Sequence, residues 1–99
     1  MKVAVLGLGL IGGSVARDLA AAGHHVLGFD RSAATLRAAR RARVIEGTIG
    51  PDFDGLESCD VCVIAVPVTD APRLLARAAR ALATVPLITD VGSTKRPIV

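Results

Sequence analysis

The feature that most constrains the fold is an apolar run that leads straight into regularly spaced glycines. Val3–Leu6 has the character of a buried strand, and a helix-like stretch begins soon after it. Between them Gly7, Gly9 and Gly12 have the spacing G-x-G-x-x-G. Such glycines allow a sharp turn, close approach of a pyrophosphate, and tight packing of helix against strand. Free N–H groups at the helix start favour an anion. The pattern predicts a dinucleotide site rather than a glycine-rich turn without a ligand.

A second apolar run supplies the acidic residue that such a site needs. Val26–Phe29 reads as a strand and ends in Asp30. A carboxylate at that place, about 20 residues after the glycines, can accept hydrogen bonds from the adenosine ribose hydroxyls. Arg31 follows directly and is a candidate contact for the 2′-phosphate of NADP. Because the charge of Asp30 would repel that phosphate, we expect NAD as the cofactor and NADP to bind less well.

The composition indicates one small domain built around a parallel sheet. The chain has 99 residues, 52% of them hydrophobic and only 2% aromatic, so aliphatic side chains form the core. Continuous apolar strands are typical of a parallel sheet covered on both faces. The net charge of +3 is spread over several segments and gives no strong case for nucleic acid. No run is long enough for a membrane helix, and the start lacks a convincing secretory cleavage site, so we expect a cytoplasmic protein.

Alternating strands and helices account for the rest of the chain. Besides the two strands above, the pattern predicts strands at Val61–Val66 and Pro86–Val91, and a weakly signalled one at Gly47–Ile49. Helices are expected at about Leu10–Ala22, at Ala33–Ala42 and after Asp70. The result is an α/β fold of the Rossmann type: an open parallel sheet in the order 3-2-1-4-5, with helices on both faces and right-handed crossovers. Residues 1–99 would form this single NAD(P)-binding domain.

The helices also carry predicted faces and caps. In the first helix Ile11, Val15 and Leu19 would point inward, with Gly23 as a left-handed cap. Ser32 would cap the second helix, whose arginines form a solvated outer face rather than a phosphate or nucleic-acid site. In the third helix the inward residues would be Leu75, Ala78 and Leu82, and the outward ones Arg73, Arg77 and Arg80.

Some residues invite a redox or metal interpretation. Cys59 and Cys62 have C-x-x-C spacing, but Cys62 falls inside a strand, so buried structural cysteines are expected instead of a redox pair. His24 and His25 are expected as surface turn residues. The acidic residues of the 44–59 segment are irregularly spaced, which favours a solvated connector over a metal site.

One further loop, and the residues between the glycines, are expected to border the cofactor. In an open parallel sheet, ligands bind beyond the carboxyl ends of the strands. Val66, Pro67 and Val68 follow one such strand. Leu8, Leu10 and Ile11, within the glycine loop, complete the predicted cofactor contacts.

Four stretches resemble the prephenate and arogenate dehydrogenase family, in its N-terminal domain. They are Gly7-Leu8-Gly9-Leu10-Ile11-Gly12-Gly13-Ser14, Ile45-Glu46-Gly47-Thr48, Ala65-Val66-Pro67-Val68 and Thr89-Asp90-Val91-Gly92-Ser93-Thr94-Lys95. The resemblance implies an oxidoreductase of tyrosine biosynthesis: hydride transfer to nicotinamide while the ring carboxylate leaves as carbon dioxide. It also implies a catalytic role for Ser93, beside the nicotinamide, where the alternative is a helix cap. Thr94 departs from the family, which usually has an apolar residue there.

The family's catalytic histidine, in a Gly-x-His-Pro motif, has no counterpart in the sequence. His24 and His25 fall at the opposite end of the predicted sheet. The family's substrate-binding residues and helical dimerisation domain also lie outside the matching stretches. We therefore expect the chain to bind NAD without turning over alone, and the complete enzyme to be a homodimer acting on prephenate or arogenate. The alternatives are the cofactor domain of a β-hydroxy-acid dehydrogenase and a non-catalytic dinucleotide-sensing module.

Overall fold

The sheet contains five parallel strands. The computed structural model describes residues 1–66 and 71–91. The elements in chain order are β1 (Lys2–Leu6), α1 (Leu10–Ala21), β2 (His25–Phe29), α2 (Ala33–Arg41), β3 (Gly47–Thr48), the 3-10 turn η1 (Leu56–Ser58), β4 (Val61–Ile64), α3 (Ala71–Leu82) and β5 (Leu87–Asp90). The strand order is β3-β2-β1-β4-β5, and every neighbouring pair is parallel. The predicted α/β fold with order 3-2-1-4-5 is confirmed.

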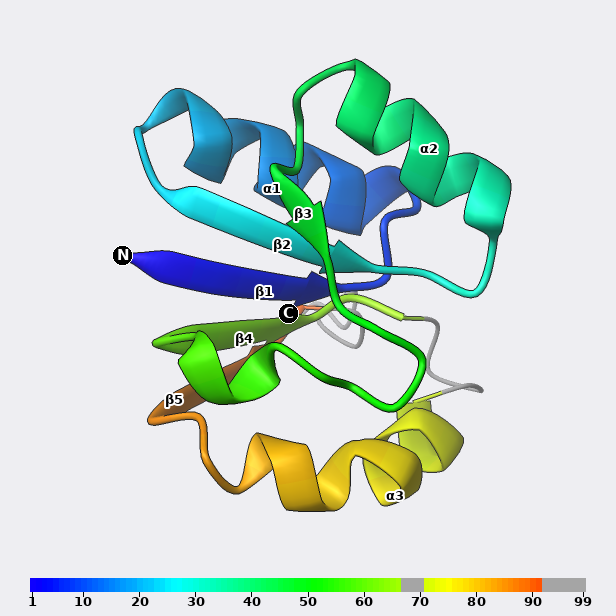
Figure 1. Cartoon of the computed structure of the whole chain (residues 1–99), viewed down its shortest axis with the longest axis vertical. Helices are drawn as coiled ribbons and strands as arrows, with labels where there is room; N and C mark the ends of the chain where they lie inside the picture. The colour runs from blue at the N-terminus through cyan, green and yellow to red at the C-terminus, as the bar shows by residue number, and fades with distance from the viewer. Residues whose placement is uncertain (67–70, 92–99) are drawn as a thin grey trace, which may run out of the picture.

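Side chains of β1 alternate between two apolar layers. Val3 and Val5 belong to the cluster that packs under α1 and α2, whereas Ala4 and Leu6 belong to the cluster under α3 and η1. Figure 1 shows the same arrangement, with α1 and α2 on one face of the sheet and α3 on the other. A strand at the centre of such a sandwich needs apolar residues at every position, because neither face meets water. The continuous run Val3–Leu6 meets that need.

The helix ends follow the predicted caps. Gly23 has φ +94°, and its N–H donates to the Ala20 carbonyl at 3.0 Å. The next N–H, of His24, donates to the Leu19 carbonyl at 3.1 Å, which completes a Schellman motif after α1. At the start of α2, the Ser32 hydroxyl accepts a hydrogen bond from the Thr35 N–H at 3.2 Å.

The inward face of α1 matches the prediction in part: Val15 and Leu19 pack against the core, whereas Ile11 does not. Gly12 and Ala16 are its buried residues, while Ile11 is 50% exposed. The cause is the tight seating of α1, since a Cβ on Gly12 would overlap the carbonyl of Gly7. The helix rests on Gly12 and the fully buried Ala16, and Ile11 lies beside them with half of its surface exposed. In α3 the buried residues are Leu74, Ala78 and Leu82, so Leu74 takes the place predicted for Leu75.

The connector before β4 contributes to the core. Its acidic residues are exposed as expected, but Ile49, Phe53 and Leu56 are buried against α3 and the sheet. The prediction of a purely solvated connector was therefore wrong for its apolar residues. These residues are separated by glycine turns, so no periodic pattern marks them in the sequence.

Both cysteines are free and buried, as expected for structural residues. Burial raises the pKa of the Cys62 thiol to about 12, and the adjacent Cys59 acts in the same direction. The Cys59 pKa is also raised, chiefly by burial. A thiol held protonated is a poor nucleophile, so the structure gives this pair no feature of a redox site.

Within residues 1–66 and 71–91, no group of three or more His, Cys, Asp or Glu residues is arranged to hold a metal ion. His25 is exposed and its Nδ1 lies 3.0 Å from Oε1 of Glu46. In the same ranges, no helix has the length and apolar character needed to cross a membrane.

Candidate functional site

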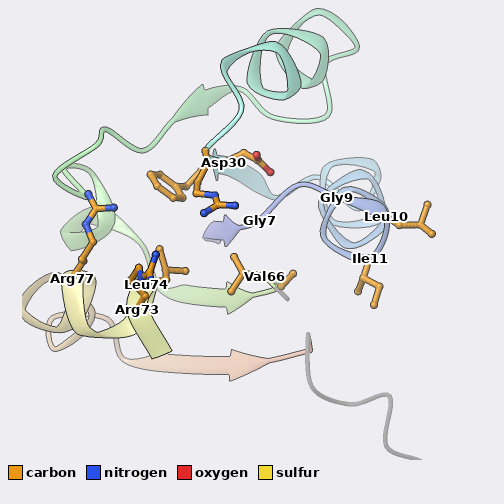
Figure 2. Close-up of a pocket in the computed structure, with 12 residues that line it drawn as sticks. Gly7, Gly9, Leu10, Ile11, Asp30, Val66, Arg73, Leu74 and Arg77 are labelled. Atoms are coloured by element: carbon orange, nitrogen blue, oxygen red, sulfur yellow. The ribbon is translucent and has the colours of Figure 1, made fainter. Parts of the chain in front are cut away.

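A cavity of about 400 Å³ opens at the carboxyl ends of the central strands. It extends from the N-terminus of α1 to the first turns of α3 (Figure 2). This is the side of an open parallel sheet where ligands bind, at the point where strand order reverses on either side of β1. Among the residues that the structure describes, its lining comes from four segments far apart in sequence: Gly7, Gly9, Leu10, Ile11, Phe29, Asp30, Arg31, Ala65, Val66, Arg73, Leu74 and Arg77.

The glycine loop shapes one wall of the cavity. Gly7 turns the chain out of β1 with φ +100°, and its N–H donates to the Phe29 carbonyl at 2.7 Å. A Cβ on Gly7 would lie 2.9 Å from the backbone of Ala65, so the loop also needs glycine there for close packing. At Gly9, by contrast, a Cβ would meet no atom within 4 Å among residues 1–66 and 71–91, apart from its own chain neighbours. Gly9 also lines the cavity, so a ligand can approach its backbone there.

The N-terminus of α1 is left available to an anion. Gly9 is the N-cap, no side chain caps the helix, and its first turn holds no acidic residue. The first helical hydrogen bond runs from the Gly13 N–H to the Gly9 carbonyl at 2.8 Å. The N–H groups that precede it, at Leu10 and Ile11, therefore lie at the positive end of the helix dipole beside the cavity. Both side chains project outward from the start of the helix (Figure 2), and Leu10 is 92% exposed.

Asp30 lies at the end of β2, facing the glycine loop. Its Oδ2 accepts a hydrogen bond from the Leu8 N–H at 2.8 Å, and its Oδ1 accepts one from the Ser32 N–H at 2.9 Å. A carboxylate has about four acceptor positions on its two oxygens, so two remain for hydroxyl donors in the cavity. Arg31 lines the cavity beside it.

Two arginines of α3 lie at the cavity, so their predicted place on the outer face was wrong. Arg73 and Arg77, expected on the outer face, line the cavity. Arg77 is held by its neighbours: its guanidinium carbon lies 5.5 Å from the centroid of the Phe53 ring, and its Nη2 donates to the Pro51 carbonyl at 3.2 Å. Phe53 in turn lies 4.9 Å from Phe29, centroid to centroid. The cavity therefore ends in a basic and aromatic wall opposite the glycine loop.

A sequence signal for this wall exists. A helix that follows a strand of a parallel sheet begins at the carboxyl edge, so its first two turns border the ligand site. The spacing of Arg73 and Arg77, four residues apart, puts both on one side of α3 beside the buried Leu74. A helical wheel alone assigns them to solvent because it does not include the cavity.

Most predicted cofactor contacts converge on the cavity. Gly7, Gly9, Leu10, Ile11, Asp30, Arg31 and Val66 all line it. Leu8 and Gly12 lie behind the loop: the Leu8 side chain is buried in the core, and Gly12 seats α1 against Gly7. Pro67, Val68 and Ser93 lie outside the described residues.

The parallel sheet, its strand order and the glycine loop at its switch point define a nucleotide-binding domain of the Rossmann type. The family described as "Prephenate dehydrogenase, nucleotide-binding domain" matches residues 15–99. The chain belongs to this family. The match begins just after the glycine motif, so the remaining strands, helices and loops carry the family signal independently of it.

Solved structures agree with the assignment. Synechocystis arogenate dehydrogenase superposes with a TM-score of 0.80 at 29% identity, over 94% of this chain and 33% of that one. A candidate prephenate dehydrogenase of Corynebacterium glutamicum has a TM-score of 0.76 at 34% identity, over 91% of this chain and 28% of that one. Prephenate dehydrogenase of A. aeolicus, in complex with hydroxyphenyl propionate and NAD+, has the same fold, with a TM-score of 0.77 at 21% identity, over 91% of this chain and 32% of that one. This chain thus spans about a third of these proteins. No curated protein sequence matches it.

Proposed function

We propose that this chain is the NAD-binding domain of an NAD-dependent prephenate dehydrogenase, which converts prephenate to 4-hydroxyphenylpyruvate in tyrosine biosynthesis. The observation that supports it best is one cavity bordered by both the open backbone at Gly9 and the carboxylate of Asp30. These are the two recognition elements for a pyrophosphate and a ribose diol. NAD+ is also the cofactor in the A. aeolicus structure.

The residues of the cavity fit the parts of NAD. The pyrophosphate would lie over Gly9, where the N–H groups of Leu10 and Ile11 can donate to it. The adenosine ribose would donate to the free acceptor positions of Asp30, and the adenine would lie toward α3. Val66, with Pro67 and Val68, would border the cofactor after β4. The bound nicotinamide supplies the hydride acceptor, and Ser93 would lie beside it as the catalytic residue.

The same argument favours NAD over NADP. A 2′-phosphate would have to replace the ribose hydroxyl that donates to Asp30, and two anionic groups would then meet. Arg31 and Arg73 line the cavity and could offset part of that repulsion. We therefore propose weaker binding of NADP, with Asp30 as the cause.

We further propose that residues 1–99, as a single domain, bind the cofactor without turning over prephenate. The histidine that the family uses to polarise the substrate hydroxyl has no counterpart in the sequence. The complete enzyme would be a homodimer in which a helical domain contributes the residues that bind prephenate or arogenate.

Calorimetric titration of the chain with NAD and NADP, comparing wild type with Gly9→Ala, tests the cofactor assignment. The new methyl group meets no non-neighbouring atom of the described residues within 4 Å, so the variant should fold normally. It would occupy the space proposed for the pyrophosphate, so we expect NAD affinity to fall at least tenfold. Unchanged NAD affinity in Gly9→Ala, or no NAD binding by folded wild type, would refute the assignment. Tighter binding of NADP than of NAD would refute the role given to Asp30.

A further inference from the structure

The carboxylate of Asp30 connects two loops that meet at the cavity. Its Oδ2 accepts from Leu8, between the first two glycines, and its Oδ1 accepts from Ser32, the N-cap of α2. The two distances are 2.8 and 2.9 Å, typical of hydrogen bonds to a charged acceptor. One side chain at the end of β2 thus holds the backbone of both the β1–α1 loop and the β2–α2 loop.

The Leu8 amide occupies the place where the glycine loop most needs such a partner. Flanking glycines give this segment more backbone freedom than any other residues would. The Gly7 N–H is bonded to the Phe29 carbonyl at 2.7 Å, and the Leu8 N–H is the next donor along the chain. After Leu8 the backbone passes through Gly9 into the first turn of α1. The orientation of the Leu8 peptide therefore sets the direction in which the following amides enter the cavity.

Given the function proposed above, we infer that Asp30 is a positioning residue for the pyrophosphate-binding loop, in addition to its contact with ribose. By holding the Leu8 amide, its carboxylate presents the N–H groups of Leu10 and Ile11 to the phosphates. Asp30 would thus act on two parts of the dinucleotide. It would contact the adenosine ribose directly, and it would influence pyrophosphate binding at the centre of the ligand only through the Leu8 amide.

The direction in which anion affinity changes when the Asp30 charge is removed separates this role from simple electrostatics. A carboxylate close to the cavity repels anions, so its removal should strengthen the binding of an anion if charge alone matters. Asparagine has one acceptor oxygen and one NH2 donor group. In Asp30→Asn the oxygen can accept a hydrogen bond from only one of the two backbone amides, and the NH2 group faces the N–H of the other, with which it cannot form a hydrogen bond. If Asp30 positions the loop, Asp30→Asn should weaken anion binding instead.

The probe is inorganic pyrophosphate, which has no ribose and so cannot sense the diol contact. We expect Asp30→Asn to lower its affinity at least fivefold in an NMR titration of the 99-residue chain. We also expect the amide that faces the new NH2 group, Leu8 or Ser32, to exchange with solvent at least tenfold faster, while the Gly7 amide, hydrogen-bonded to Phe29, keeps its protection. Asp30→Glu retains both acceptor oxygens and should recover part of both effects.

A matched control is Asp60→Asn. Asp60 also accepts a backbone hydrogen bond, from the Lys2 N–H at 2.9 Å, but at the start of β1. The substitution removes the same charge beside the same type of hydrogen bond, but far from the glycine loop, so pyrophosphate affinity should stay as in wild type. Equal or tighter pyrophosphate binding by Asp30→Asn, or unchanged exchange at both Leu8 and Ser32, would overturn the positioning role. Folded wild type that binds neither NAD nor pyrophosphate would instead refute the proposed function.

Discussion

Gly12 illustrates how one missing methyl group sets the geometry of the site. A Cβ at this position would overlap the Gly7 carbonyl and also lie 3.1 Å from the Ala65 side chain. Neither neighbour can move freely, because Gly7 is bonded to β2 and Ala65 donates its N–H to Leu6 at 2.8 Å. The short distance between α1 and β1, and with it the direction of the α1 amides, depends on this contact.

The substitution Gly12→Ala should therefore lower the free energy of unfolding by about 3 kcal/mol, the cost of forcing a group into a packed contact. Gly13→Ala is the matched control on the same helix. Its Cβ would lie 3.5 Å from the Leu8 carbonyl oxygen, an ordinary contact, and alanine is favoured in a helix by about 1 kcal/mol. Urea denaturation followed by circular dichroism measures both. Equal stabilities for the two variants would contradict the argument.

The sequence predicts some site residues better than others, for a physical reason. The positions of Gly7, Gly9 and Asp30 at the cavity are predictable because they follow from spacing along a strand, a turn and a helix. Arg77 is not, because its position depends on Phe53, which lies in a connector without periodicity and has φ +63°. The second function inferred for Asp30 is not predictable either, since the pattern gives its position but not the partner of each oxygen.

The α3 helix combines a structural face and a ligand-facing side. Its buried residues Leu74, Ala78 and Leu82 pack on the sheet, and Arg77 fastens its middle to the connector through Phe53 and Pro51. The existence of such elements and their order along the sheet are predictable, because right-handed crossovers leave few alternatives. Their rotation is less predictable, because it is decided by single close contacts, as the exposed Ile11 of α1 shows.

Arg77→Ala should cost about 1 kcal/mol of stability, from the loss of one hydrogen bond and a cation–π contact at the surface. It should also weaken NAD binding severalfold, because the cavity wall where we propose that the adenosine binds loses its cation and its support. Arg80→Ala, an exposed position in the last turn of the same helix, should change stability by less than about 0.5 kcal/mol and leave NAD affinity unaltered. The readouts are urea denaturation and calorimetry, and identical results for the two variants would count against an anchored Arg77.

The two apolar clusters share one sheet, so a buried group in β4 reports on the stability of the whole domain. Cys62 is fully buried between β1 and β5, paired with Ala4 and Ile88. Its thiol has a pKa near 9 when exposed and about 12 in the folded chain, because burial disfavours the thiolate. Between those values the unfolded chain releases a proton that the folded chain keeps, so stability falls as the pH rises. Below pH 9 the contribution is fully present.

The expected slope is up to about 1.4 kcal/mol per pH unit for one thiol, from one proton difference. Tyrosine, which titrates in the same range, is absent from the sequence. Urea denaturation at about pH 8 and about pH 10.5, on either side of the exposed thiol's pKa, should therefore show a marked loss of stability in wild type. Cys62→Ala starts from a lower value because it leaves a small cavity, but its stability should fall less over the same range. If the stabilities of wild type and Cys62→Ala fall equally with pH, the alkaline loss does not come from Cys62. The free energy of unfolding is then not linked to the titration of this buried thiol.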